Sequence, residues 1–150
     1  SKNILKLKDA NSTEFKDTNN PVVGLMTEWT KDNVKLKRHE KSDKGGTMRL
    51  GSYPCNLIKD SFVYKIYGSN KIHERHRHRY EVNTKYMKKF EQKGFIYSGM
   101  SPDNSLPEII EFKNHPWFIG VQFHPELKSR PQHPHPLFVS FIKASLKVLK

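Results

Sequence analysis

Residues 117–126 read Trp117-Phe118-Ile119-Gly120-Val121-Gln122-Phe123-His124-Pro125-Glu126, an apolar run that stops at a histidine, a proline and a carboxylate. Aromatic and β-branched residues bounded by prolines are typical of a buried strand, because proline cannot donate to a sheet ladder. His124 and Glu126 then emerge at the carboxyl end of this strand, where open α/β sheets place their ligands. Residues two apart in extended backbone point the same way, so Glu126 can orient the imidazole. The alternative is a purely structural histidine–carboxylate pair.

Length and composition restrict the class of protein. A chain of 150 residues has the size of one ordinary domain. It contains neither a run of ~18 apolar residues nor an N-terminal signal segment, so we expect a cytoplasmic protein without a membrane partner. The net charge of +12 would suit nucleic acid, but the lysines are scattered along the sequence, as on an ordinary solvated surface. We therefore expect no nucleic-acid partner.

Periodicity and turn residues predict the remaining elements. A helix capped by Asp60 is expected to run through Ile66 and to end near Gly68. The other expected elements are an alternating strand over 72–82, an amphipathic helix from Thr84 to Gly94, strands over 95–100 and 106–112, and a final helix over 137–146.

One segment combines histidines with arginines: Glu74-Arg75-His76-Arg77-His78-Arg79-Tyr80-Glu81. In a strand its arginines occupy one face and its histidines the other. A metal site is not expected, because the guanidinium groups would repel a cation and no ligand set has zinc spacing. Arginine suits carboxylate recognition, and the alternative is a solvated basic strand.

The only cysteine is Cys55, in the apolar segment Tyr53-Pro54-Cys55-Asn56-Leu57. No glycine flanks it to form a strained elbow, and apolar surroundings raise the pKa of a thiol. We therefore predict a buried structural cysteine rather than a nucleophile.

Several segments together carry a family resemblance. They are Asp9-Ala10-Asn11-Ser12-Thr13-Glu14-Phe15, residues 41–51 with Gly45-Gly46-Thr47-Met48-Arg49, residues 74–83, Glu108-Ile109-Ile110-Glu111, residues 121–126, and His135-Pro136-Leu137-Phe138. In this order they resemble the C-terminal part of the class I glutamine amidotransferase domain of the CTP synthases. The histidine-proline-glutamate motif is common to class I amidotransferases, whereas its combination with the arginine–histidine segment is specific to the CTP synthases.

The resemblance implies a role for each matching residue. His124 would be the general base and acid of a cysteine-nucleophile triad, oriented by Glu126. Arg79 would hold the α-carboxylate of glutamine, and Glu14 its α-amino group. Three further residues would belong to the lid and the GTP effector site: Arg38, Thr47 and Arg49.

The resemblance also implies what surrounds this chain. Residues 1–150 would form the C-terminal portion of a three-layer α/β domain, a central mostly parallel sheet with flanking helices. The nucleophile elbow and the synthetase domain would lie outside it, so the chain alone would be inactive. The complete ligase would hydrolyse glutamine and aminate UTP with ATP and Mg²⁺ as a GTP-activated homotetramer, with no cofactor or metal in this part. The alternative is a non-catalytic nucleotide-binding or regulatory relic of the fold.

Overall fold

The computed structural model describes residues 1–25 and 48–148. Two of the expected effector residues, Arg38 and Thr47, lie outside the described residues. The strands are β1 (Asn11–Ser12), β2 (Pro21–Gly24), β3 (Arg49–Leu57), β4 (Lys71–His78), β5 (Glu81–Val82), β6 (Phe95–Met100), β7 (Pro107–Phe112) and β8 (Ile119–Val121). The helices are α1 (Phe62–Tyr67), α2 (Met87–Glu91) and α3 (Pro136–Val148), with short 3₁₀ turns η2 (Thr84–Tyr86) and η3 (Pro125–Leu127).

The strands form two sheets. The larger sheet has the order β4-β3-β6-β7-β8, and the smaller has the order β1-β2-β5. The predicted α/β class is confirmed, but the expectation of a mostly parallel sheet was wrong for the described strands, since every pairing in the larger sheet is antiparallel. Short loops, residues 101–106 and 113–118, connect β6 to β7 and β7 to β8. A parallel pair of strands would need a crossover connection of about a dozen residues or more.

Strand β8 differs from the predicted buried strand. It covers only Ile119–Val121, it is half-buried, and no other described strand lies beyond it in the sheet. Trp117 has left the ladder, and its indole N–H donates to Ser140 Oγ of α3 at 2.9 Å. Phe118 is exposed. An edge position explains the difference, because a strand with one neighbour buries less surface than a central strand.

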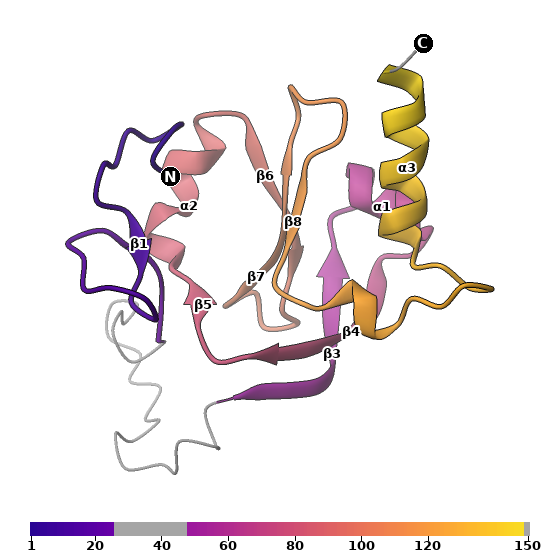
Figure 1. Cartoon of the computed structure of the whole chain (residues 1–150), viewed down its shortest axis with the longest axis horizontal. Coiled ribbons are helices and arrows are strands. Elements are labelled where there is room, and N and C mark those ends of the chain that lie inside the picture. The colour runs from indigo at the N-terminus through magenta and orange to yellow at the C-terminus, as the bar shows by residue number, and fades with distance from the viewer. Residues whose placement is uncertain (26–47, 149–150) are drawn as a thin grey trace.

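Helices α1 and α3 lie side by side on one side of the larger sheet (Figure 1). The core beneath them joins residues from four strands and both helices, and it includes Cys55, Val63, Ile109, Phe123 and Leu137. The Glu111 carboxylate of β7 accepts hydrogen bonds from the backbone N–H groups of Phe62 and Val63, at 3.1 and 2.7 Å. The first turn of α1 is therefore fastened to the sheet by a buried side chain.

Two predicted boundaries need correction. The N-cap of α1 is Ser61, whose Oγ accepts from Tyr64 N, while Asp60 precedes it with φ 65°. The expected end at Gly68 is confirmed by its left-handed conformation. The predicted strand over 72–82 is interrupted at Arg79 and Tyr80, where the chain passes from the larger sheet to the smaller one.

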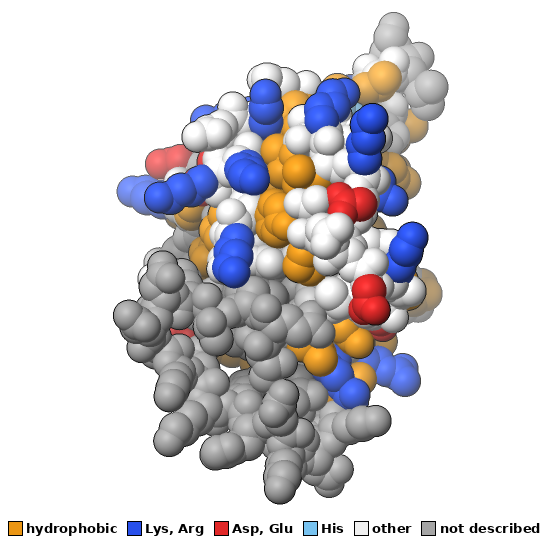
Figure 2. All heavy atoms as spheres, turned by 90° about the vertical axis from the view of Figure 1, so that its left-hand side faces the viewer, with side chains coloured by type: hydrophobic (Ala, Val, Ile, Leu, Met, Phe, Trp, Pro, Cys, Tyr) orange, Lys and Arg blue, Asp and Glu red, His pale blue; other side chains and the backbone are white. Residues whose placement is uncertain are grey.

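The other predictions agree closely with the structure. Residues 84–91 form η2 followed by α2, the strands over 95–100 and 107–112 form a hairpin, and α3 contains the expected final helix. Figure 2 shows one face of the molecule, on which lysine and arginine side chains are scattered around a band of hydrophobic ones. Among the helices that the structure describes, none is long and apolar enough to span a bilayer.

Candidate active site

His124 and Glu126 form a hydrogen-bonded pair at the start of η3, a few residues after β8. His124 Nδ1 lies 2.7 Å from Glu126 Oε1. The turn of η3 brings the two side chains together, so the predicted pair is confirmed while its expected extended backbone was wrong. The hydrogen bond from His124 lowers the pKa of Glu126, which is therefore an acceptor, and His124 carries its proton on Nδ1. The lone pair of Nε2 is then available for proton transfer.

The backbone holds this pair against the larger sheet. His124 N donates to the carbonyl oxygen of Arg75 in β4 at 2.8 Å. The side chains of His124 and Glu126 are 38% and 58% exposed, so the pair opens to solvent in the described chain. The imidazole and the carboxylate are therefore held together at the start of η3, in the arrangement that a histidine base and its orienting carboxylate require.

A buried ion cluster lies next to the strand that leads to His124. Arg49 Nη1 lies 2.7 Å from Glu108 Oε1 and 3.5 Å from Glu81 Oε1, and both carboxyl groups are almost fully buried. Gln122 donates to Glu81 Oε2 at 2.9 Å. Burial raises the pKa of Glu81 to about 7 against the opposing charge of Arg49, and burial also raises the pKa of Glu108. One arginine thus serves two buried carboxyl groups, and Glu81, with its raised pKa, takes up a proton near neutral pH.

The inward histidines of β4 are bonded to each other. His76 Nδ1 lies 2.8 Å from His78 Nε2, and His78 Nδ1 lies 3.0 Å from the Tyr80 carbonyl oxygen. A carbonyl only accepts, so His78 donates from Nδ1 and accepts on Nε2 from His76. Burial, followed by the charge of Arg49, lowers the pKa of His76 to about 3 and that of His78 to about 4. The two rings are neutral. Three of their four nitrogens are engaged in this chain, whereas the buried His76 Nε2 has no hydrogen-bond partner among the described residues.

No metal site accompanies these histidines in the part of the chain that the structure describes, where no group of three or more potential ligand side chains is assembled. Cys55 is fully buried in β3, as predicted. Burial, with a smaller effect of the Glu108 charge, raises the pKa of its thiol to about 12. A thiol with such a pKa is almost entirely protonated at neutral pH and is a poor nucleophile.

The other predicted site residues lie on separate elements. Glu14 follows β1 and is exposed, whereas Arg79 lies half-buried between β4 and β5. Within the described residues, neither side chain makes a hydrogen bond or an ion pair. Arg49 begins β3, and its guanidinium faces the buried carboxyl groups and the Tyr53 ring, 4.7 Å from the ring centroid.

A second polar cluster was not anticipated from the sequence. Glu74 Oε1 lies within 3.2 Å of Tyr67 OH, Lys128 Nζ and His135 Nε2. The only feature of the sequence that pointed to this cluster was the alternation of β4, which predicts that Glu74 lies on the same buried face as Ile72 and His76. The partners come from distant parts of the chain, so no local pattern marks them.

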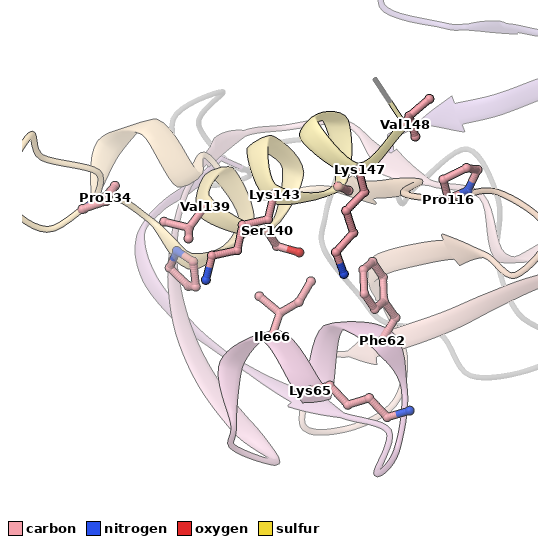
Figure 3. Close-up of a pocket in the computed structure, with 12 residues that line it drawn as sticks. Phe62, Lys65, Ile66, Pro116, Pro134, Val139, Ser140, Lys143, Lys147 and Val148 are labelled. Atoms are coloured by element: carbon pink, nitrogen blue, oxygen red, sulfur yellow. The ribbon is translucent and has the colours of Figure 1, made fainter. Parts of the chain in front are cut away.

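A groove of about 700 Å³ lies between α1 and α3 (Figure 3). Apolar side chains including Phe62, Ile66 and Val139 line it together with Lys143 and Lys147. Its lining contains neither His124 nor Glu126, so it is separate from the candidate active site.

Comparison with known proteins identifies the family. The model of the family "Glutamine amidotransferase class-I" matches residues 13–144. The chain belongs to the class I glutamine amidotransferase family. Within this amidotransferase family it is 60% identical over 146 residues to CTP synthase of Hyphomonas neptunium, and 64% identical over 144 residues to that of Pelagibacter ubique. These matches cover 97% and 96% of this chain and 27% of each relative.

A solved amidotransferase domain has the same fold. The glutaminase domain of Trypanosoma brucei CTPS, solved with bound acivicin, is 36% identical with a TM-score of 0.82. The match covers 98% of this chain and 54% of that domain. The predicted resemblance to the amidotransferase part of CTP synthase is therefore confirmed. The chain spans about a quarter of the length of its curated relatives.

Proposed function

We propose that this chain supplies the histidine–glutamate part of a glutaminase site that delivers ammonia for the amination of UTP to CTP. The 2.7 Å contact between His124 Nδ1 and Glu126 Oε1 carries the proposal, because it leaves Nε2 free to move a proton at the start of η3. The similarity of the chain to CTP synthases and to a glutaminase domain selects this reaction among those that a histidine base can serve.

The proposed reaction needs a cysteine from the part of the enzyme outside this chain, because the buried thiol of Cys55 is unsuited to attack. Nε2 of His124 takes the proton of the cysteine thiol, and the resulting thiolate attacks the amide carbon of glutamine. The His124 imidazolium then gives this proton to the departing ammonia, which leaves a thioester. His124 then takes a proton from water, which attacks the thioester and releases glutamate. Glu126 stabilises the imidazolium that forms in each step.

Substrate recognition would use charged groups that have no described partner. Arg79 presents a planar guanidinium that can pair with the α-carboxylate of glutamine, and Glu14 offers a carboxylate for its α-amino group. Arg38, Thr47 and Arg49 remain candidates for the lid and the GTP effector site. The ion pairs of Arg49 support an effect through the nearby residues 79–81 rather than through direct contact with GTP.

The remaining parts of the proposal concern the whole enzyme. Ammonia would pass to a synthetase domain that binds UTP, ATP and Mg²⁺, in a cytoplasmic homotetramer with GTP as activator. We expect the 150-residue chain alone to release no ammonia from glutamine, and measurable release by the purified chain would contradict that expectation.

A chimera tests the proposed function directly. Residues 1–150 would replace the matching 27% of Hyphomonas neptunium CTP synthase, which supplies the missing parts. We expect CTP formation with glutamine or with ammonia as nitrogen donor, and His124→Ala is expected to abolish only the glutamine-dependent rate. A chimera that uses ammonia but not glutamine, or a His124→Ala variant that still uses glutamine, would overturn the proposal.

A second candidate is a non-catalytic nucleotide-binding or regulatory relic, which the lack of an accessible cysteine in these 150 residues favours. The coding sequence upstream of Ser1 separates the two candidates. A continuous frame with a Gly-x-Cys-x-Gly elbow supports the enzyme, whereas a start at this point supports the relic.

A further inference from the structure

Glu74 lies at the centre of a buried cluster beside the catalytic pair. Its side chain is 1% exposed, and one oxygen, Oε1, accepts from three donors. Tyr67 OH and His135 Nε2 each lie 3.1 Å away, and Lys128 Nζ lies 3.2 Å away. Leu137 N donates to His135 Nδ1, so the proton of this ring is on Nε2 and points to Glu74.

Two of these donors lie on the segment that follows the catalytic pair. Lys128 comes directly after η3, and His135 directly precedes α3. Lys128 Nζ also donates to the His73 carbonyl oxygen at 2.6 Å, and His135 N donates to Ser129 Oγ at 3.1 Å. At its start the same segment is bonded to β4 by His124 N. Segment 124–135 is therefore tied to β4 at both ends, and Glu74 makes the charged contacts.

The charge of Glu74 is part of this arrangement. Burial acts to raise its pKa, but the hydrogen bonds from His135 and Lys128, together with the charge of Lys128, outweigh burial and lower the pKa. The carboxylate is therefore ionised at neutral pH, and a neutral side chain in its place would leave the Lys128 ammonium without its counter-charge. Glu74 makes no contact with His124 or Glu126 in the described structure, so any effect on them passes through segment 124–135.

We propose that Glu74 is a positioning residue for His124: it anchors segment 124–135 to β4 through Lys128 and His135, and so holds the imidazole in its catalytic place. This inference rests on the proposed glutaminase function. Loosening the segment displaces the base without removing it, and small displacements of a catalytic group have large effects on rate. The binding of glutamine should be unaffected, because Arg79 and Glu14 lie outside the segment.

The test uses the chimera with Glu74→Gln. We expect the glutamine-dependent kcat to fall about tenfold, because the base is misplaced by a fraction of an ångström. The KM for glutamine and the rate with ammonia should stay unchanged. Lys128→Met, at a partly exposed position that tolerates substitution, should reproduce the effect even if Glu74→Gln folds poorly. The double variant should be no slower than the single ones, since both remove the same link.

Glu111→Gln is the matched control. Glu111 is buried like Glu74, and its carboxylate also accepts hydrogen bonds, from the backbone N–H groups of Phe62 and Val63. It fastens α1 rather than segment 124–135. Its variant should change stability and leave the glutamine-dependent kcat unchanged. Equal losses of kcat in the Glu74 and Glu111 variants, or none in Glu74→Gln and Lys128→Met, would overturn the positioning role. A parent chimera without glutamine-dependent activity would instead count against the proposed function.

Discussion

Replacing Glu81 by glutamine should remove a pH-dependent contribution to stability. Glu81 is 2% exposed, and burial raises its pKa from the ordinary value of 4.5 to about 7, with Arg49 opposing and Glu108 adding to the rise. The folded chain thus binds this proton more tightly than the unfolded chain. The contribution of the carboxyl group is fully present below pH 4.5 and is lost as the pH rises through about 7.

The size of the effect follows from the pKa. Each pKa unit corresponds to about 1.4 kcal/mol, so the rise from 4.5 to about 7 amounts to about 3 kcal/mol of unfolding free energy. Glutamine keeps an oxygen for the Gln122 amide but does not titrate. Arg49 retains its 2.7 Å ion pair with Glu108 in the variant. As the pH rises from 4.5 to 8, the free energy of unfolding of Glu81→Gln should therefore increase by about 3 kcal/mol relative to that of the parent chain.

Urea denaturation followed by circular dichroism between pH 4.5 and pH 8 measures this difference. The buried histidines His76 and His78 also make stability depend on pH. Their pKa values are lowered to about 3 and about 4, so the free energy of unfolding decreases as the pH falls below 6.5. This contribution is the same in variant and parent and cancels when the two are compared. Glu91→Gln, at an exposed position of α2, removes the same charge and should show no such pH dependence. A difference between Glu81→Gln and the parent that does not change with pH would refute the reasoning.

Three further perturbations have defined outcomes. Gly99→Ala should destabilise the fold by about 1–3 kcal/mol, because the added Cβ would lie 2.6 Å from Ile109 Cγ1; an unchanged denaturation midpoint contradicts this. Ser61→Ala should cost about 1 kcal/mol by the same measurement, through loss of the bond from Tyr64 N, while Ser52→Ala, at an exposed position, should cost little. Iodoacetamide should label Cys55 rapidly only in denaturant, and rapid native labelling, seen by mass spectrometry, argues against its burial.

The sequence alone determined most of the local elements and the pairing of His124 with Glu126. The hairpin over 95–112 could be predicted because two strand-like segments flank a turn rich in serine, proline and asparagine. The end of α1 could be predicted because Gly68 readily adopts the left-handed conformation, here with φ 67°. The family could be recognised because its motifs lie in short, contiguous segments. His124 and Glu126 are close in sequence, so their contact required only local backbone geometry.

Only the tertiary structure decided how distant charges are paired. Glu74 meets Lys128 and His135, and Arg49 meets Glu81 and Glu108, across sequence separations that periodicity cannot register. The antiparallel order of the larger sheet and the half-buried edge position of β8 also depend on which strands become neighbours. The physical reason is that pKa values and burial arise from the surroundings of a side chain in space, and those surroundings come from the whole fold.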